Sequence, residues 1–109
     1  MARPKKNQRV VCISLRADGT LRVEPDPVRV KVGHRVRWVT IVRDSKKIEV
    51  SFSKRSGTPF REGRGVAVHG ELLSPAVADH AKGKRYKYTV SLHVGKHVFK
   101  LDPEVEVER

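Results

Sequence analysis

The stretch that decides the fold reads "DPVRVKVGHRVRWVT" and runs from residue 26 to residue 40. Polar and apolar residues alternate through it on both sides of Gly33 and His34. Alternation with a period of two places apolar side chains on one face of a β-strand and charged side chains on the other. We therefore expect two strands that meet at a Gly33-His34 turn. The residues expected to face the core are Val28, Val30, Val32, Val36 and Trp38, and those expected to face outward are Arg29, Lys31, Arg35 and Arg37.

Similar short runs precede and follow this stretch. An apolar, β-branched run at residues 10–15 is followed by Asp18-Gly19, a dipeptide typical of hairpin turns. A second run at residues 21–24 returns from this turn and ends at prolines, which cannot donate to a strand ladder. Further runs that favour strands lie at residues 48–52, 86–94, 97–101 and 104–108.

The segment from residue 54 to residue 84 is irregular and rich in Gly and Arg. It carries one helix signal, with Ser74 as the N-cap, Pro75 at the first helical position and Gly83 after the end. Many short strands with turns between them are typical of a sandwich or a barrel. We predict an all-β chain that forms a single Greek-key β-sandwich of seven or eight short strands, with one short helix in the loop around residues 75–81.

The chain of 109 residues is long enough for one domain. Residues 1–8, "MARPKKNQ", are polar and basic, so we expect a disordered basic arm followed by a single domain over residues 9–109. No apolar run is long enough for a transmembrane helix, and the start lacks the apolar segment of a signal peptide. We therefore expect no membrane insertion and a cytoplasmic location.

The order of these pieces resembles the cupredoxin-like β-sandwich family over residues 20–108. The resemblance rests on the strand–Gly–Trp-strand pattern, then "IEVSF", an irregular excursion, "YKYTVSLH" and a final strand. In the family this pattern reads like V-x-V-x-x-G-D-x-V-x-W. The residues at comparable places here are Val30, Val32, Gly33, Val36 and Trp38.

Cupredoxins hold copper with His, Cys, His and usually Met, and the resemblance implies where these ligands would fall. Ile48 stands in place of the first His, Val90 in place of the Cys and His93 in place of the second His, with the Met position near Val98 or Phe99. A type-1 copper site depends on the thiolate and two imidazoles. Since only one of the four ligands is kept, we expect no blue-copper chemistry and no cofactor.

Two histidines, His93 and His97, still require consideration as metal ligands. If residues 94–96 form a three-residue hairpin loop, the two imidazoles face each other across neighbouring strands. Stable zinc sites need three or four ligands. The remaining candidates are distant in sequence: His34, His69, His80 and Glu71. We expect two solvated surface histidines, and residual copper or zinc binding at this pair is an alternative.

No enzyme signature occurs in the sequence. The Gly-rich stretch at residues 57–65 lacks the Lys-Ser/Thr of a phosphate-binding loop, and neither GxSxG nor HExxH is present. Cys12 is the only cysteine, and it lies inside an apolar run, so we expect a buried structural thiol. We therefore predict that the protein is not an enzyme.

Net charge carries the strongest functional signal. The chain has a formal charge of +12, and residues 1–55 hold 15 Lys/Arg against 5 Asp/Glu. Such a field attracts polyanions, above all the phosphates of nucleic acid. If the strands on either side of Gly33 form a hairpin, their cations make one face, and if the strands diverge, the patch splits. The candidate nucleic-acid-binding residues are Lys5, Lys6, Arg9, Arg29, Lys31, Arg35 and Arg37.

Binding to nucleic acid is expected to lack sequence specificity, because no recognition helix, zinc finger or RNP-type aromatic pattern is present. Trp38, Tyr86 and Tyr88 have core-facing phases, whereas Phe60 in the irregular loop is expected to be free to contact a partner. The alternative is a protein-interaction module in which an exposed strand edge or the loop at residues 54–64 docks an acidic partner protein.

Overall fold

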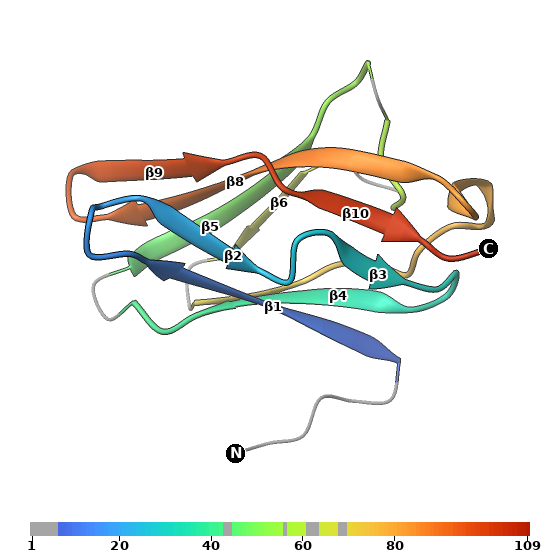
Figure 1. The fold of residues 1–109 in the computed structure, drawn as a ribbon, viewed down its shortest axis with the longest axis horizontal. Coiled ribbons are helices and arrows are strands. Elements are labelled where there is room, and N and C mark those ends of the chain that lie inside the picture. Colours follow the sequence, from blue (N-terminus) through green and yellow to red (C-terminus); the bar gives the residue numbers. More distant parts are fainter. Residues whose placement is uncertain (1–6, 43–44, 56, 61–63, 68–69) are drawn as a thin grey trace.

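The computed structural model describes residues 7–42, 45–55, 57–60, 64–67 and 70–109 and shows an all-β chain (Figure 1). The strands are β1 (Gln8–Leu15), β2 (Leu21–Glu24), β3 (Val28–Val30), β4 (Arg35–Thr40), β5 (Ser45–Phe52), β6 (Arg64–Ala67), β7 (Glu71–Leu73), β8 (Arg85–Val94), β9 (His97–Leu101) and β10 (Glu104–Val107). The predicted all-β class is confirmed, but the strand number is wrong. Among the described residues ten strands replace the expected seven or eight, because the segment expected to be irregular also contributes the short strands β6 and β7.

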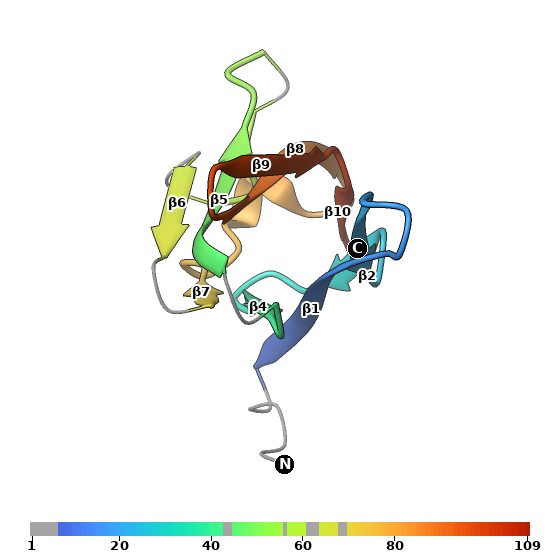
Figure 2. The same cartoon turned by 90° about the vertical axis from the view of Figure 1, so that its left-hand side faces the viewer.

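The strands form two mixed sheets that face each other across the core (Figure 2). One sheet has the order β2-β1-β4-β7, in which β1 and β4 run parallel. The other has the order β3-β10-β8-β5-β6, in which β3 and β10 run parallel. β9 pairs with residues 90–94 of β8, whereas β10 pairs with residues 85–87 of the same strand.

The expected hairpin at Asp18-Gly19 is confirmed. β1 and β2 pair antiparallel, and Gly19 adopts the positive φ of +84° that suits glycine. Asp18 stabilises the turn by accepting hydrogen bonds from both the backbone N–H and the hydroxyl of Thr20. A local dipeptide signal was sufficient here because the two strands are neighbours in sequence.

The chain passes from one sheet to the other between Glu24 and Val28, at Pro25 and Pro27. Proline cannot donate a ladder hydrogen bond, so β2 ends there. Consequently β3 and β4 belong to different sheets and do not form a hairpin. The inward and outward phases predicted for these two strands are nevertheless those observed.

The core is aliphatic, with an aromatic cluster that joins the two sheets. Trp38 of β4 donates its indole N–H to the hydroxyl of Tyr88 in β8 at 3.1 Å, and both side chains are buried. Phe60 packs edge-on against Trp38 and Phe52. The expectation that Phe60 is free for a partner is therefore wrong: it is 3% exposed and anchors the irregular loop to the core.

The predicted helix around residues 75–81 is reduced to one 3-10 turn, η1 (Asp79–Ala81). Ser74 does not cap a helix, because its hydroxyl accepts the N–H of Val36 and donates to the carbonyl of Pro75, each at 2.8 Å. The backbone of Val77 accepts a hydrogen bond from the N–H of Gly33 and donates one to the carbonyl of His34, both in the β3–β4 turn. Tertiary hydrogen bonds thus replace the helical ones that the local sequence favours.

Two further expectations concern the N-terminal region. Cys12 is exposed, not buried, because it alternates with the inward residues Val11 and Ile13 of β1. Gln8, assigned to the arm, is already the first residue of β1. Residues 1–6 of the expected arm, with Lys5 and Lys6, lie outside the described residues.

Candidate nucleic-acid interface

The cations predicted on β3 and β4 do not form one face, because these strands lie in different sheets. Arg29 projects from β3 and lies 3.3 Å from Glu106 of β10, while Arg37 projects from β4 and lies 3.2 Å from Glu71 of β7. Each of these two cations therefore has a carboxylate next to it. Neither is a free charge for a phosphate.

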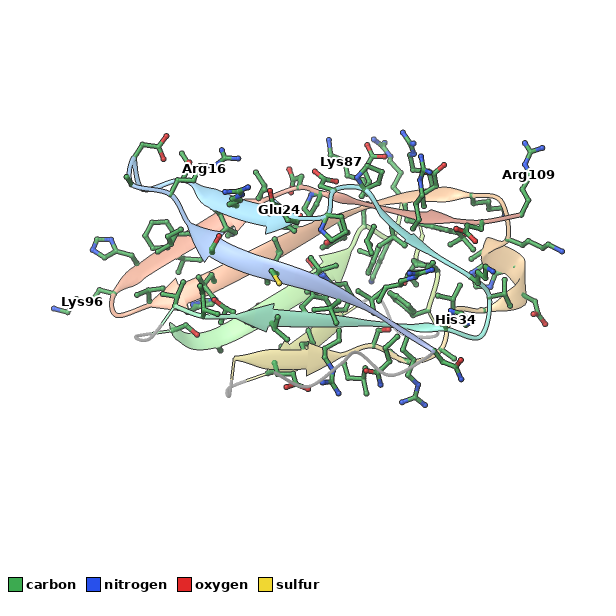
Figure 3. All side chains as sticks on the ribbon, turned by 60° about the horizontal axis from the view of Figure 1, so that its bottom comes forward. Arg16, Glu24, His34, Lys87, Lys96 and Arg109 are labelled. Carbon is green, nitrogen blue, oxygen red and sulfur yellow. The ribbon has the colours of Figure 1, made fainter. Side chains whose placement is uncertain are left out.

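The remaining two cations of the stretch lie at one end of the sandwich. Lys31 and Arg35 flank the β3–β4 turn, are exposed, and form no ion pair with any carboxylate in the described part of the chain. Figure 3 labels His34 of this turn, which lies at the same end of the sandwich as Arg109.

Three cations that the sequence did not suggest lie at the same end. Lys82 and Lys84 follow η1, and Arg109 follows β10. All three are exposed and, like Lys31 and Arg35, have no described carboxylate within ion-pair distance. We call this set the basic end, and it consists of Lys31, Arg35, Lys82, Lys84 and Arg109.

Backbone hydrogen bonds fix the parts of the basic end to one another. Glu108 donates to the carbonyl of Val30 at 2.8 Å, which places Lys31 beside the last residues of the chain. Gly83 donates to the carbonyl of Val107, and Val107 donates to that of Lys84. The side chain of Arg109 lies over Gly83. No local sequence signal could have found this cluster, since its members come from three segments that meet only in the folded chain.

The charge of the basic end is only partly balanced. Asp79 and Glu108 are the carboxylates on the same segments, against five Lys and Arg side chains. Exposed cations of this kind keep their hydration and mobility, so they suit phosphate contacts that position a polyanion without reading its bases. The aromatic residues that would stack on bases are absent from this set, because Trp38, Tyr86 and Tyr88 are buried as expected.

Arg9 is the other candidate cation that the structure describes. It is exposed on β1 and borders an open groove of about 530 Å³, whose lining also includes Arg29, Pro25 and Glu108. Of the seven candidate residues, the structure therefore places Lys31 and Arg35 in the basic end and Arg9 and Arg29 along this groove. Arg37 stands apart on the outer face of the four-stranded sheet.

His93 and His97 do not face each other. The loop between β8 and β9 has two residues, Gly95 and Lys96, with Gly95 at a φ of +59°, as in a Gly-X hairpin turn. In this register Val94 pairs with His97, and His93 pairs with Val98. The three-residue loop that would bring the two histidines together is therefore not formed, and the two imidazoles lie on opposite faces of the sheet.

Each histidine has a different neighbour. His93 Nε2 lies 3.2 Å from Glu49. Glu49 also forms ion pairs with Lys47 at 2.9 Å and with Arg64 at 3.3 Å. The Lys47 hydrogen bond, with smaller contributions from His93 and Arg64, lowers the pKa of Glu49. His97 packs near the ring of Phe99. Among the described residues, no three His, Cys, Asp or Glu side chains are grouped closely enough to hold a metal ion.

The positions that correspond to copper ligands do not converge either. Ile48 and Val90 are fully buried and face the core, whereas His93 is on the outer face of the same sheet. The distance of three residues between Val90 and His93 within one regular strand is enough to separate their faces. Blue-copper chemistry thus has neither its ligand types nor their arrangement.

A comparison of the chain with models of protein families and with curated proteins finds no match. In the part of the chain that the structure describes, no helix has the length and apolar character needed to cross a membrane.

Proposed function

We propose that this chain is a non-catalytic, metal-free binding module that holds a polyanion, most directly nucleic acid, at its basic end without sequence specificity. The observation that carries the proposal is the convergence, from three separate segments, of five exposed cations that have no ion-pair partner among the described residues. Arg29, Arg37 and Arg85 are paired with carboxylates on the outer sheet faces, whereas the five cations of the basic end form no ion pair with any described residue. Other exposed cations, such as Arg16 and Lys96, lie elsewhere, but the basic end brings five together from three segments.

We also propose that the module is cupredoxin-like. Support comes from the two mixed sheets, from the strand–Gly–Trp-strand pattern around Gly33 and Trp38, and from the long β8 that carries Tyr86 and Tyr88. The copper chemistry of that family is not part of the proposal, because a thiolate at Val90 and an imidazole at Ile48 are missing.

Fluorescence anisotropy with labelled duplex DNA tests the function. Neutralising about five phosphates gives a slope of about −4.5 when the logarithm of affinity is plotted against the logarithm of salt concentration. Two duplexes of unrelated sequence should bind equally well. An absence of binding to DNA and RNA at low salt, or an affinity that salt does not change, would refute the proposal.

A matched pair of double variants locates the site. Lys31→Gln with Lys84→Gln removes two charges from the basic end, and Arg16→Gln with Lys96→Gln removes two from exposed turns at the opposite end of the molecule (Figure 3). Net charge falls equally in both. We expect the first variant to bind DNA at least about tenfold more weakly than the second at low salt. Equal losses would mean that overall charge, and not the basic end, determines binding.

A further inference from the structure

β1 is longer than the strand that pairs with it on one side. On its β4 side, β1 is paired from Gln8 to Ile13, but on its β2 side it is paired only from Cys12 to Leu15. Residues 8–11 therefore have a strand on one side only among the described residues. The cause is the crossing at Pro25 and Pro27, where the chain leaves this sheet before β2 has covered the length of β1.

This unpaired edge borders the open groove of about 530 Å³. Residues 8–10 of β1 line it together with Pro25, Pro27 and residues 28–29 of β3. β3 is itself the last strand of the other sheet, since it pairs with β10 alone. Alternate residues of a strand direct their N–H and C=O groups to opposite sides, so part of the backbone of residues 8–11 faces the groove without a partner strand.

The side chains in the groove indicate the chemistry of an occupant. Gln8 is part of the groove lining, and its buried Oε1 has no hydrogen-bond donor in the described part of the chain. Arg9 is exposed and forms no ion pair with any described residue, while Arg29, 71% exposed, is paired with Glu106. Glu108 is the single carboxylate in the lining. A free strand edge and the cation of Arg9 together suit an extended backbone that carries negative charge.

We propose that this groove binds an extended acidic peptide of a partner protein. The peptide would pair with residues 8–11 of β1 on the edge that β2 covers only from Cys12 onward. Backbone hydrogen bonds would supply affinity, and an acidic side chain near Arg9 would supply selectivity. The chain provides an internal example, because β10, with the sequence Glu-Val-Glu-Val, pairs with β3 and places Glu106 beside Arg29.

Charge argues against two other occupants. Residues 1–6 contain Arg3, Lys5 and Lys6 and no acidic residue, so this segment does not complement the arginines of the groove. A second copy of the chain carries a net charge of +12 and would be repelled overall. The inference is independent of nucleic-acid binding, since its site and its ligand differ from those of the basic end.

The probe is a fluorescent seven-residue peptide, EVEVEVE, titrated into the full-length protein at moderate salt. We expect saturable binding, with amide-exchange protection and NMR shift changes confined to residues 8–11 and 28–30. A peptide of the same sequence that is N-methylated at alternate residues keeps its charge but loses strand hydrogen bonds, so it should bind about tenfold more weakly. Arg9→Gln should weaken binding about threefold, whereas Arg16→Gln, at the other end of β1, should have no effect.

Three results would overturn the proposal. Equal binding of the N-methylated peptide would show attraction by charge alone. Shift changes centred on Lys82 and Lys84 would place the peptide at the basic end. Amides of Gln8 and Val10 that are already protected in the free protein would show that the chain covers this edge itself, since those of Arg9 and Val11 are directed to β4.

Discussion

The hydrogen bond between Trp38 and Tyr88 links the two sheets, and removing its acceptor tests how the sandwich is held together. Trp38 is 2% exposed, and its indole N–H has the Tyr88 hydroxyl as its acceptor at 3.1 Å. Tyr88→Phe keeps the ring and deletes this acceptor. The buried indole N–H then has no partner, which costs about 1–3 kcal/mol of the free energy of unfolding.

Tyr86→Phe is the matched control, because Tyr86 lies two residues earlier on the same inward face and its hydroxyl has no hydrogen bond to any described residue. We expect its free energy of unfolding to change by less than about 0.5 kcal/mol. Urea unfolding followed by the fluorescence of the single Trp gives both values. For Tyr88→Phe, thermal unfolding should show a midpoint lowered by about 4–8 °C for each kcal/mol.

High pH gives a second readout of the same residue. Burial raises the pKa of the Tyr88 hydroxyl, and this outweighs the lowering by the Trp38 hydrogen bond. A raised pKa in the folded state contributes stability that is complete below the unfolded-state pKa of 10.0 and is lost as the pH rises above it. Wild type should therefore lose more stability above pH 10 than Tyr88→Phe. Equal destabilisation of Tyr88→Phe and Tyr86→Phe at neutral pH, or an alkaline profile of Tyr88→Phe parallel to that of wild type, would refute the reasoning.

Three other outcomes can be measured with single substitutions or reagents. Cys12 is exposed on β1, so in the folded protein it should react with a thiol reagent about as fast as in urea, and protection in the folded state would contradict its placement. The lowered pKa of Glu49 contributes stability above its ordinary value of 4.5, and this contribution is lost as the pH falls below that value. The difference between the urea midpoints of wild type and Glu49→Gln should therefore be constant above pH 4.5 and shrink below it. His93→Ala should leave zinc and copper uptake in equilibrium dialysis unchanged, because His97 lies on the opposite face, and reduced uptake would restore the metal hypothesis.

The sequence predicted what depends on neighbouring residues. The alternation around Gly33 gave the inward phases of Val30, Val36 and Trp38, and Asp18-Gly19 gave the first hairpin. Strand pairing was not predictable in the same way, because the same alternation is compatible with a hairpin or with a crossing between sheets. The prolines at 25 and 27 ended β2 as expected. That β2 therefore pairs with only part of β1 could be recognised only from the folded structure.

The candidate site shows the same division. Lys31 and Arg35 were identified from their outward phase, whereas Lys82, Lys84 and Arg109 required the contacts of Val30 with Glu108 and of Gly83 with Val107. The facing histidine pair that was considered as an alternative metal site is not formed, for a different reason. A hairpin loop of two residues instead of three reverses the face of every later side chain in the strand, and the sequence "VGK" did not distinguish the two lengths.

The salt dependence of DNA binding by the two charge-matched double variants tests the central claim most directly. If the basic end contacts phosphates, Lys31→Gln with Lys84→Gln should reduce the steepness of the log–log slope by about 1.8, because each lost contact removes about 0.9. Arg16→Gln with Lys96→Gln should keep the wild-type slope, since these cations lie at the opposite end. The same slope for all three proteins, or a reduction only in the Arg16 and Lys96 variant, would contradict the account.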